Sequence, residues 1–318
     1  MITATLANKT TAFFFFFLVT GSLLAQPANA QSKAGFSLSA EPAYQEVEVV
    51  ANELSVETVI TFTNSSDSPQ HLEFFAFDFK QTDHFGSLAL LEGVADDYPH
   101  TLASFISFNK DSVVIPPKSS EELLVRVENR ASLTPGGHYA AVVARGVTDT
   151  IDEKQKIIPA LSALLLVRKT GGERPHLSLT KVDWDTRSAT FTLPKKVTLT
   201  FQNDGNVHVI PRGSISVTDV FGTTVAQGTI NETSSYVLPG TIRELSTVLK
   251  KSRPVLPLTL ISVSVEGYTT IGNIPFTAEQ SFLYIDFWFL IVLGMIITAV
   301  VLHKKIKKLF LKLKTYAP

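Results

Sequence analysis

One apolar run near the C-terminus, which stops at a lysine-rich end, constrains this chain most. The run covers residues 287–302, and six lysines follow it without one acidic residue. Sixteen residues are fewer than the roughly 20 that cross a bilayer core, but extension back to Phe282 gives 21. A buried strand or core helix would not explain the lysines. We therefore expect a transmembrane helix over residues 285–303 and a basic tail over residues 304–318.

Two kinds of side chain are expected to anchor this helix. Tyr284 and Trp288 lie at its outer end, where aromatic residues form a belt at the membrane surface. The positive-inside rule assigns the lysines at the other end to the cytoplasm, among them Lys304, Lys305, Lys307 and Lys308. A helical tail would have one apolar and one basic face, so we expect it to lie on the inner leaflet, with about 1 kcal/mol of attraction to anionic lipid per lysine. A membrane span directly before the lysines argues against a nucleic-acid patch.

The N-terminus has the features of a secretory signal peptide over residues 1–30. Lys9 provides the positive charge, residues 12–25 form a short apolar core, and residues 28–30 give an A-x-A cleavage site. A retained anchor is the alternative, but the short core followed by Pro27 favours cleavage after Ala30. Together the two ends predict a single-pass protein of the cell membrane, with an extracellular N-terminal ectodomain and a cytoplasmic tail.

The segment between the signal and the helix is acidic and lacks cysteine. It carries 21 basic and 29 acidic residues, and the whole excess lies in residues 31–171, which hold 11 basic and 19 acidic residues. This charge argues against nucleic acid, or an anionic wall polymer held by bulk charge, as the partner. An exported chain without cysteine is not stabilised by disulfides, which fits a bacterial envelope and excludes thiol catalysis and cysteine-metal sites.

Short β-patterns separated by turn signals fill the ectodomain. Residues 56–63 are rich in β-branched side chains, and Phe75, Phe77 and Phe79 alternate within a strand that is apolar on nearly both faces. Asn, Ser, Pro and Gly clusters mark turns between such segments. Strands at this spacing, without convincing amphipathic helices, predict antiparallel β-sandwiches. Residues 87–107 stay ambiguous between a short helix and an irregular excursion.

A break at residues 170–172, Thr-Gly-Gly, divides the ectodomain into two β-series. About 255 residues suit two domains of roughly 100–140 residues. We therefore predict a mainly β fold with two tandem immunoglobulin-like sandwiches, over residues 31–171 and 172–284, followed by the transmembrane helix. The segments 61–64 and 200–203 are both Thr-Phe-x-Asn followed by a polar turn, a weak sign that the two domains are related.

Several segments together resemble one bacterial family. Residues 116–127 read Pro-Pro-x-x-Ser-x-x-Leu-x-Val-x-Val, and residues 134–141 read Thr-Pro-Gly-Gly-His-Tyr-Ala-Ala. With the segments 40–49 and 73–79, they resemble the first domain of WxL-interacting cell-surface proteins. The resemblance, looser over residues 203–240, implies two immunoglobulin-like domains, a transmembrane helix and a basic tail. It implies that the first domain binds peptidoglycan or another wall component and the second a WxL-type surface protein. The first domain also resembles pilus-chaperone domains.

The segment Pro135-Gly136-Gly137-His138-Tyr139 could be a binding loop, but we favour a structural role. Glycines permit positive φ at a sharp corner, and Tyr139 leads into a strand as a tyrosine-corner residue does. In a disulfide-linked immunoglobulin domain a cysteine would follow two residues later, where this chain has Ala141.

A metal site has one weak candidate. Asp78, Asp83 and Asp97 belong to the only dense group of potential ligands, together with three neighbours, Asp96, His84 and His100. Hard oxygen ligands of this kind could hold Ca²⁺, yet the spacing matches no known calcium loop. We therefore expect no metal and no other cofactor.

The sequence is equally poor in catalytic motifs. It has no G-x-S-x-G, no H-E-x-x-H and no glycine-rich phosphate loop, so we expect no enzyme. The favoured function is a membrane-anchored envelope protein that binds a wall component or another surface protein. The alternative is a membrane-anchored assembly chaperone, which exposed apolar side chains alternating along an uncovered edge strand would favour. A third reading, a hydrolase using Asp78, Asp83 or Asp97, would need two carboxylates ~5–9 Å apart in a deep pocket.

Overall fold

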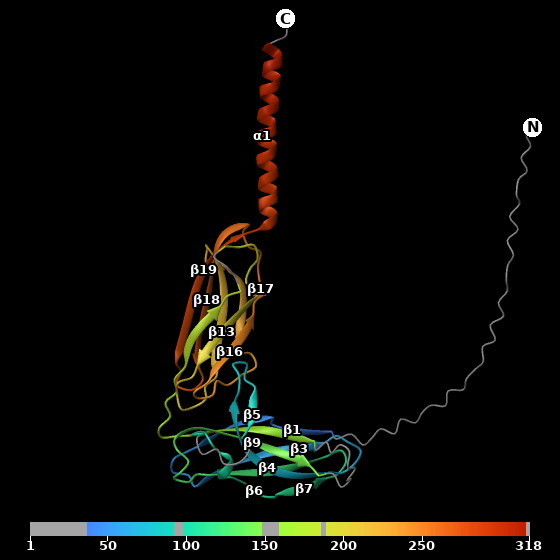
Figure 1. Ribbon diagram of the computed structural model, residues 1–318, viewed down its shortest axis with the longest axis vertical. Coiled ribbons are helices and arrows are strands. Elements are labelled where there is room, and N and C mark those ends of the chain that lie inside the picture. Colours follow the sequence, from blue (N-terminus) through green and yellow to red (C-terminus); the bar gives the residue numbers. More distant parts are fainter. Residues whose placement is uncertain (1–36, 92–97, 148–158, 186–188, 316–318) are drawn as a thin grey trace, which may run out of the picture. The chain divides into compact units, whose positions relative to one another are not determined.

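A computed structural model describes residues 37–91, 98–147, 159–185 and 189–315, without the side chains of 309–315. The predicted signal peptide and Asp97 lie outside these residues. Two β-sandwiches follow one another in the chain, and a single helix comes after them (Figure 1).

The first sandwich packs a four-stranded sheet against a six-stranded sheet. The four-stranded sheet has the order β1 (Leu38–Glu41), β3 (Ser55–Asn64), β8 (Ser119–Glu128) and β6 (Ile106–Phe108). The other has the order β2 (Tyr44–Val49), β10 (Ala160–Lys169), β9 (Gly136–Gly146), β4 (Gln70–Gln81) and β5 (Leu88–Leu90), and β7 (Ser112–Ile115) also pairs with β4. A 3₁₀ turn, η1 (Ala103–Phe105), precedes β6. The ambiguous residues 87–107 thus hold β5, this turn and the start of β6, apart from residues 92–97, which are not described.

Alternation along these strands produces the core of the first sandwich. Ile60 and Phe62 of β3 point inward, with Leu123 of β8 beside Ile60, as the period of two along a strand requires. Strand β9 differs, because its residues 136–144 are buried on both faces. One face packs on the four-stranded sheet, while Tyr139 and its neighbours on the other face belong to a separate apolar cluster.

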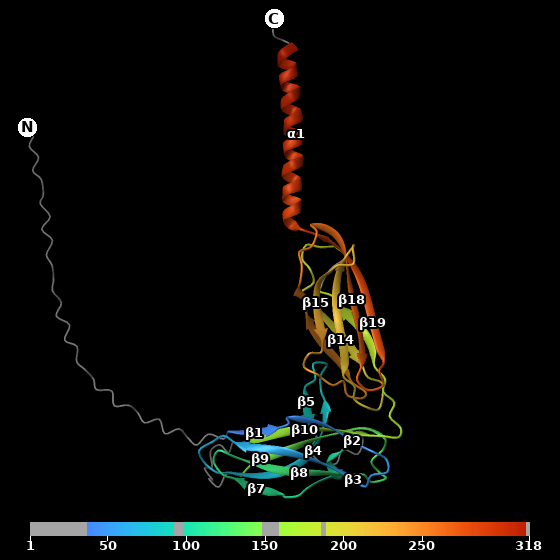
Figure 2. The ribbon, with the colours of Figure 1, turned by 180° about the vertical axis from the view of Figure 1, so that it is seen from behind.

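The second sandwich repeats this plan. Its smaller sheet has the order β11 (Ser178–Asp183), β13 (Lys196–Gln202) and β16 (Ile242–Val248). Its larger sheet has the order β12 (Ala189–Thr190), β19 (Pro275–Ile285), β18 (Leu258–Thr269), β14 (Pro211–Asp219), β15 (Thr224–Ile230) and β17 (Lys250–Lys251). Figure 2 shows β14, β15, β18 and β19 side by side. Aromatic contacts, including Phe201 with Phe276 and Trp184 with Phe282, fill the core between the sheets.

The predicted fold class is confirmed, with one difference in strand direction. Each larger sheet contains one parallel pair, β2 with β10 and β12 with β19, whereas the other described pairs of strands are antiparallel. The described sheets of residues 38–169 share no strand with those of residues 178–285. That residues 31–171 and 172–284 are independent domains stays a prediction.

The two Thr-Phe-x-Asn segments have the same local structure in both sandwiches. Asn64 and Asn203 are fully buried at the ends of β3 and β13. Each side-chain Nδ2 donates to the carbonyl four residues ahead and to a distant one, of Ile115 or Val237. Each Oδ1 accepts the backbone N–H two residues ahead, at 2.9 Å in both cases. The shared sequence therefore encodes the same asparagine-stabilised turn.

The C-terminal helix, α1 (Phe287–Thr315), follows β19 with a single residue, Asp286, between them. Asp286 caps it, since its Oδ1 accepts hydrogen bonds from the N–H groups of Trp288 (2.8 Å) and Phe289 (3.2 Å). Residues Phe287–Lys308 form a 22-residue segment that is long and apolar enough to cross a membrane. An 18-residue stretch within it has a mean hydropathy of 2.1, and none of that stretch is buried. The helix continues without a break through the lysines.

Candidate functional site

The junction between the sandwiches begins at the predicted glycine corner. Pro135 precedes Gly136, the first residue of β9, which has a φ of +128°. Gly137 donates its N–H to the carbonyl of Asn206 in the second sandwich, at 2.8 Å. A Cβ atom at Gly137 would lie 2.1 Å from the Tyr139 hydroxyl. The Tyr139 side chain therefore folds back over position 137 and leaves room only for glycine there.

A buried polar cluster lies beneath this corner. The Tyr139 hydroxyl is 3.2 Å from Nδ1 of His208, and both side chains are fully buried. Nε2 of His208 lies 3.3 Å from Oε1 of Glu46, close enough for an ionic contact but without good hydrogen-bond geometry. This contact lowers the pKa of Glu46, and burial raises the pKa of Tyr139. The hydroxyl of Tyr139 thus has a partner in the other sandwich.

A hairpin between β4 and β5 makes a second connection. Its tip is shaped by Asp83, whose Oδ1 accepts the N–H groups of Phe85 and Ser87 at 2.9 Å. The carbonyl of His84 accepts the N–H of Glu244, at 2.7 Å, on the free edge of β16. Nearby, Gln81 donates its side-chain N–H to the carbonyl of Ile242, also at 2.7 Å. The hairpin therefore pairs locally with the small sheet of the second sandwich.

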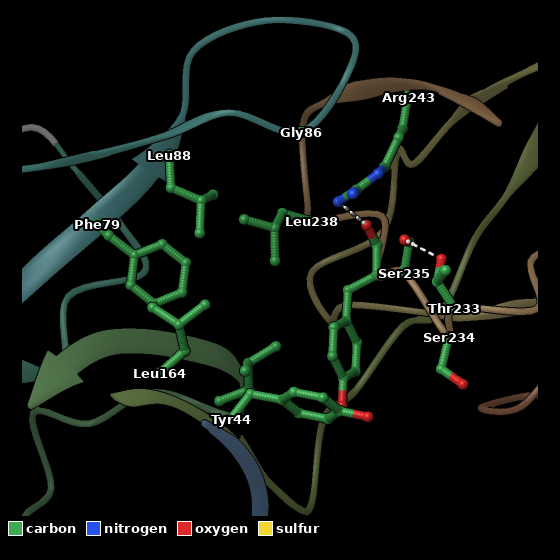
Figure 3. A pocket seen from close by; sticks show the side chains of 12 residues that line it. Tyr44, Phe79, Gly86, Leu88, Leu164, Thr233, Ser234, Ser235, Leu238 and Arg243 are labelled. Atoms are coloured by element: carbon green, nitrogen blue, oxygen red, sulfur yellow. Dashed lines mark hydrogen bonds between the residues drawn. The ribbon is translucent and has the colours of Figure 1, made fainter. Parts of the chain in front are cut away.

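A pocket of about 250 Å³ lies between the hairpin, β10 and the segment 233–238 (Figure 3). Leucine and aromatic side chains form most of its wall: Tyr44, Phe79, Leu88, Leu164, Leu166, Tyr236 and Leu238. The polar part of the wall comes from the hydroxyl groups of residues 233–235 and from Arg243.

Among the residues that the structure describes, Arg243 is the single charged one in the pocket wall. Its guanidinium donates to the carbonyl of Tyr236 at 2.7 Å, and burial lowers its pKa. Gly86 lies directly beside this group, since a Cβ atom there would be 2.3 Å from Cζ of Arg243. The arginine is thus held along the wall, and the apolar centre of the pocket stays open (Figure 3).

The wall of this pocket suits the binding of an apolar group. The described residues contribute no acidic side chain and no histidine to this wall. Apolar pockets with a few polar groups accept ligands or side chains of partner proteins. At the rim, Leu88, Leu90 and Phe85 are exposed, so the apolar surface continues out of the pocket along β5.

Two of the predicted metal candidates, Asp78 and Asp83, are described, and neither lines this pocket. Asp78 is buried on β4, and its Oδ1 accepts the N–H groups of Leu102 and Ala103 at 2.6 and 2.7 Å. Asp83 orders the hairpin tip, and Asp97 is outside the described residues. Among the residues described, no group of three or more histidine and acidic side chains is placed to hold a metal ion.

The predicted anchor residues lie at the end of the second sandwich and on α1. Tyr284 is buried at the end of β19, with its hydroxyl 3.3 Å from a carboxylate oxygen of Asp286. Trp288 is exposed in the first turn of α1. The four predicted lysines are exposed on the same helix: Lys304, Lys305, Lys307 and Lys308. Their role at a membrane stays a prediction.

Sequence reasoning missed the residues that form the junction. No sequence pattern pointed to a function for His208, Tyr236 or Arg243, and Tyr44 fell only within the segment 40–49 of the family resemblance. His208 had one usable signal, because it lies between Val207 and Val209 in an apolar segment. Such a position favours a buried histidine with a specific partner.

Comparison with known proteins gives matches in structure only. No protein-family model matches the sequence, and no curated protein matches it. A chain from a chaperone–tip adhesin complex of CFA/I fimbriae has a TM-score of 0.41 and 10% identity, over 79% of this chain and 99% of that one. The E. coli chaperone DraB has a TM-score of 0.35 and 14% identity, over 78% and 97%. The PapD-like domain 7 of human CEP192 has a TM-score of 0.31 and 9% identity, over 50% and 99%.

At these TM-scores the likeness assigns no function to this chain. The resemblance to WxL-interacting proteins has no support from a matched family and stays a prediction. Chaperones are named for the first two of these structures, as in the resemblance of the first domain to pilus-chaperone domains.

Proposed function

We propose that this protein is a membrane-anchored binding protein that holds an extended segment of another exported protein at the sandwich junction. The observation that carries the proposal is the apolar pocket between β10 and the segment 233–238, open beside the edge strand β5. An apolar side chain of a partner would fill the pocket, while its neighbours in the partner would cover Leu88 and Leu90.

Strand β5 favours the chaperone-like alternative over attachment to the cell wall. It is the last strand of its sheet, and the described strands include no partner on its outer edge. Leu88 and Leu90 alternate along it and are both exposed. An edge strand with apolar side chains is a template for strand addition, in which backbone hydrogen bonds give affinity and pockets give specificity. The hydrolase reading has no such support, because Asp78 and Asp83 bind backbone N–H groups.

The membrane helix sets where this binding takes place. We propose that α1 spans the membrane, with both sandwiches outside the cell and the lysines inside, as the positive-inside rule requires. Protease added to intact protoplasts should then digest the sandwiches, while an epitope at the C-terminus survives. Protection of the sandwiches would contradict this orientation.

Wall binding by residues 31–171, and capture of a WxL-type protein by residues 172–284, stay predictions without a specific site. A sedimentation assay of the full chain with insoluble peptidoglycan tests the first of them. Since the first sandwich is acidic, any true attachment should survive moderate salt.

Cross-linking from the pocket rim tests the proposed function. The chain has no cysteine, so Leu88→Cys gives one site for a photoactivatable thiol reagent on the full-length protein in membranes. The matched control is Val114→Cys, another exposed apolar position, on the edge strand β7. We expect a protein adduct at residue 88, absent at residue 114, that is lost when Leu164→Trp fills the pocket. Equal adducts at both positions, or an adduct unaffected by Leu164→Trp, would contradict the proposal.

A further inference from the structure

The second sandwich is joined to the membrane helix almost without a linker. β19 ends at Ile285 and α1 begins at Phe287, so Asp286 alone separates strand from helix. Each polar headgroup layer of a bilayer is roughly 5–8 Å thick, the distance covered by about two residues of a strand. If α1 spans the membrane, residues level with Ile285 therefore lie in or beside this layer.

Strand register shows which residues are at that level. Leu258 of β18 pairs with Ile285, and the carbonyl of Pro257 accepts the N–H of Asp286 at 2.7 Å. Thr190 of β12 pairs with Tyr284, which places the next residue, Phe191, level with Ile285.

The turn between β14 and β15 extends toward the same level. Asp219 pairs with Ile261, which in turn pairs with Phe282. The residues after Asp219, Val220 and Phe221, therefore continue past Phe282 toward the start of the helix.

The side chains at this end are unusually apolar for an exposed surface. Phe221 is 75% exposed and Phe191 is 58% exposed. Three aliphatic residues at the same end are also exposed: Val220, Leu256 and Leu258. Aromatic side chains in contact with water are typical of surfaces that bind a partner or a membrane interface.

Hydrogen bonds within the turn between β14 and β15 fix the backbone at Phe221. Oδ1 of Asp219 accepts the N–H groups of Phe221 and Thr223, both at 2.9 Å, and Gly222 has a φ of +75°. This turn holds the backbone on either side of the phenylalanine in place. Its ring is therefore presented at the end of the sandwich by a defined turn.

We propose that this end of the second sandwich binds the lipid surface from which α1 emerges, with Phe221 and Phe191 in the headgroup layer. The inference rests on the proposed membrane anchoring, and it extends the membrane contact from the helix to the sandwich. Continuity with the helix identifies lipid as the partner, since no loop separates the two. The exposed charges near this end include both signs: Lys195, Lys196, Lys250, Lys251 and Arg253, and Asp183 and Asp185. The proposal is tested with neutral lipid, where attraction between charges cannot produce the binding.

Single-cysteine labelling of the full-length protein tests the inference. Phe221→Cys and Phe191→Cys are labelled with an environment-sensitive fluorophore and reconstituted in phosphatidylcholine vesicles that contain lipids with a nitroxide at a shallow position. Tyr268→Cys is the matched control, because Tyr268 is half exposed and lies at the opposite end of β18, beside Pro275. Val292→Cys, within α1, reports insertion of the helix.

We expect the labels at residues 221 and 191 to lose most of their emission to the nitroxide lipids, while the label at residue 268 keeps its emission. If the label at 292 is quenched but those at 221 and 191 behave like that at 268, the sandwich does not bind lipid although the helix is inserted. If the label at 292 is not quenched either, membrane anchoring itself is wrong.

Discussion

The hydroxyl of Tyr139 lies 3.2 Å from Nδ1 of His208, and this contact joins the two sandwiches through a fully buried pair of side chains. The two residues are 69 positions apart, and each comes from a different sandwich. Around them, Tyr236 packs edge-on against His208, with ring centroids 5.3 Å apart. A polar contact in such surroundings is costly to break, because each partner left alone remains buried.

Removal of this hydroxyl should weaken the junction. Tyr139→Phe should lower the free energy of unfolding by about 1 kcal/mol, since Nδ1 of His208 loses its partner. Chemical denaturation of Tyr139→Phe, His208→Phe and the double variant gives the coupling between the two residues. Strictly additive effects would show that the contact contributes nothing of its own.

Gly137 should tolerate no side chain. In Gly137→Ala the new methyl group would overlap the Tyr139 hydroxyl and force the ring away from His208, at a cost of about 1–3 kcal/mol. Gly294→Ala is the control, because a Cβ atom there has no neighbour within 4 Å. Thermal unfolding in detergent compares the two variants. Equal melting temperatures for Gly137→Ala and the unchanged protein would contradict the tight approach.

The carboxylate of Asp78 should act through hydrogen bonds and not through a metal ion. Asp78→Ala removes the acceptor of two backbone N–H groups, one buried and one part-buried, and hydrogen bonds to charged groups contribute about 1.5–3 kcal/mol each. Asp83→Ala, at the hairpin tip, should cost less. Neither EDTA nor millimolar Ca²⁺ should move the melting temperature. A rise of several degrees with Ca²⁺, lost in Asp83→Ala, would establish a calcium site.

Stability should fall as the solution becomes acidic, in two steps. Burial lowers the pKa of His100 and of His138. Below about pH 6.5 the unfolded chain therefore binds protons at these histidines that the folded chain does not bind, and the free energy of unfolding falls. Glu46 has a lowered pKa through its contact with His208, so its contribution is lost only as the pH falls below about 4.5.

The variant His100→Asn separates the first step from the second. The asparagine can still donate to the carbonyl of Gly137, which lies 2.7 Å from Nδ1 of His100, but it does not titrate. The loss of stability between pH 7 and pH 5 should therefore be smaller in this variant than in His71→Asn, a change at an exposed position. Identical pH profiles would exclude His100 as a cause.

Each sandwich should fold when produced alone, but the first should lose more thermal stability than the second. Residues 31–170 and 173–284 have separate cores, so each fragment should unfold cooperatively. The first fragment would expose Phe79, Tyr139 and Leu166, which belong to a cluster completed by Leu238 of the second sandwich. It should therefore melt well below the joined ectodomain in calorimetry. A single transition that exists only in the joined protein would make the two-domain division wrong.

Most of the fold could be predicted from the sequence, because each strand carries its own alternation of side chains. The run Phe75, Phe77 and Phe79 predicted a strand that is apolar on nearly both faces. The structure explains this pattern. On one face of β4, Phe74 packs into the core of the first sandwich, and on the other face Phe79 belongs to the apolar cluster with Tyr139 and Leu238. The Thr-Phe-x-Asn repeat likewise encodes the two asparagine-stabilised turns, since its hydrogen bonds are mostly local.

The junction could not be predicted in the same way. Tyr139, His208 and Glu46 come together only when both sandwiches have folded and docked, and no pattern within one strand specifies this contact. The same holds for Arg243, whose position depends on the hairpin tip at Gly86. Single-sequence patterns describe the faces of each strand, but they do not describe which faces of separate sandwiches meet.

The direct passage from β19 into α1 also has a mechanical consequence. If α1 spans the membrane as proposed, any load that a bound partner places on the sandwiches would reach the membrane through the C-terminal end of β19. This strand pairs antiparallel with β18 at eleven successive positions, and the load would act along the strands. Its hydrogen bonds would then be sheared together and not unzipped one after another. Since the rate of unfolding decides survival under force, this pairing would let the protein resist pulling.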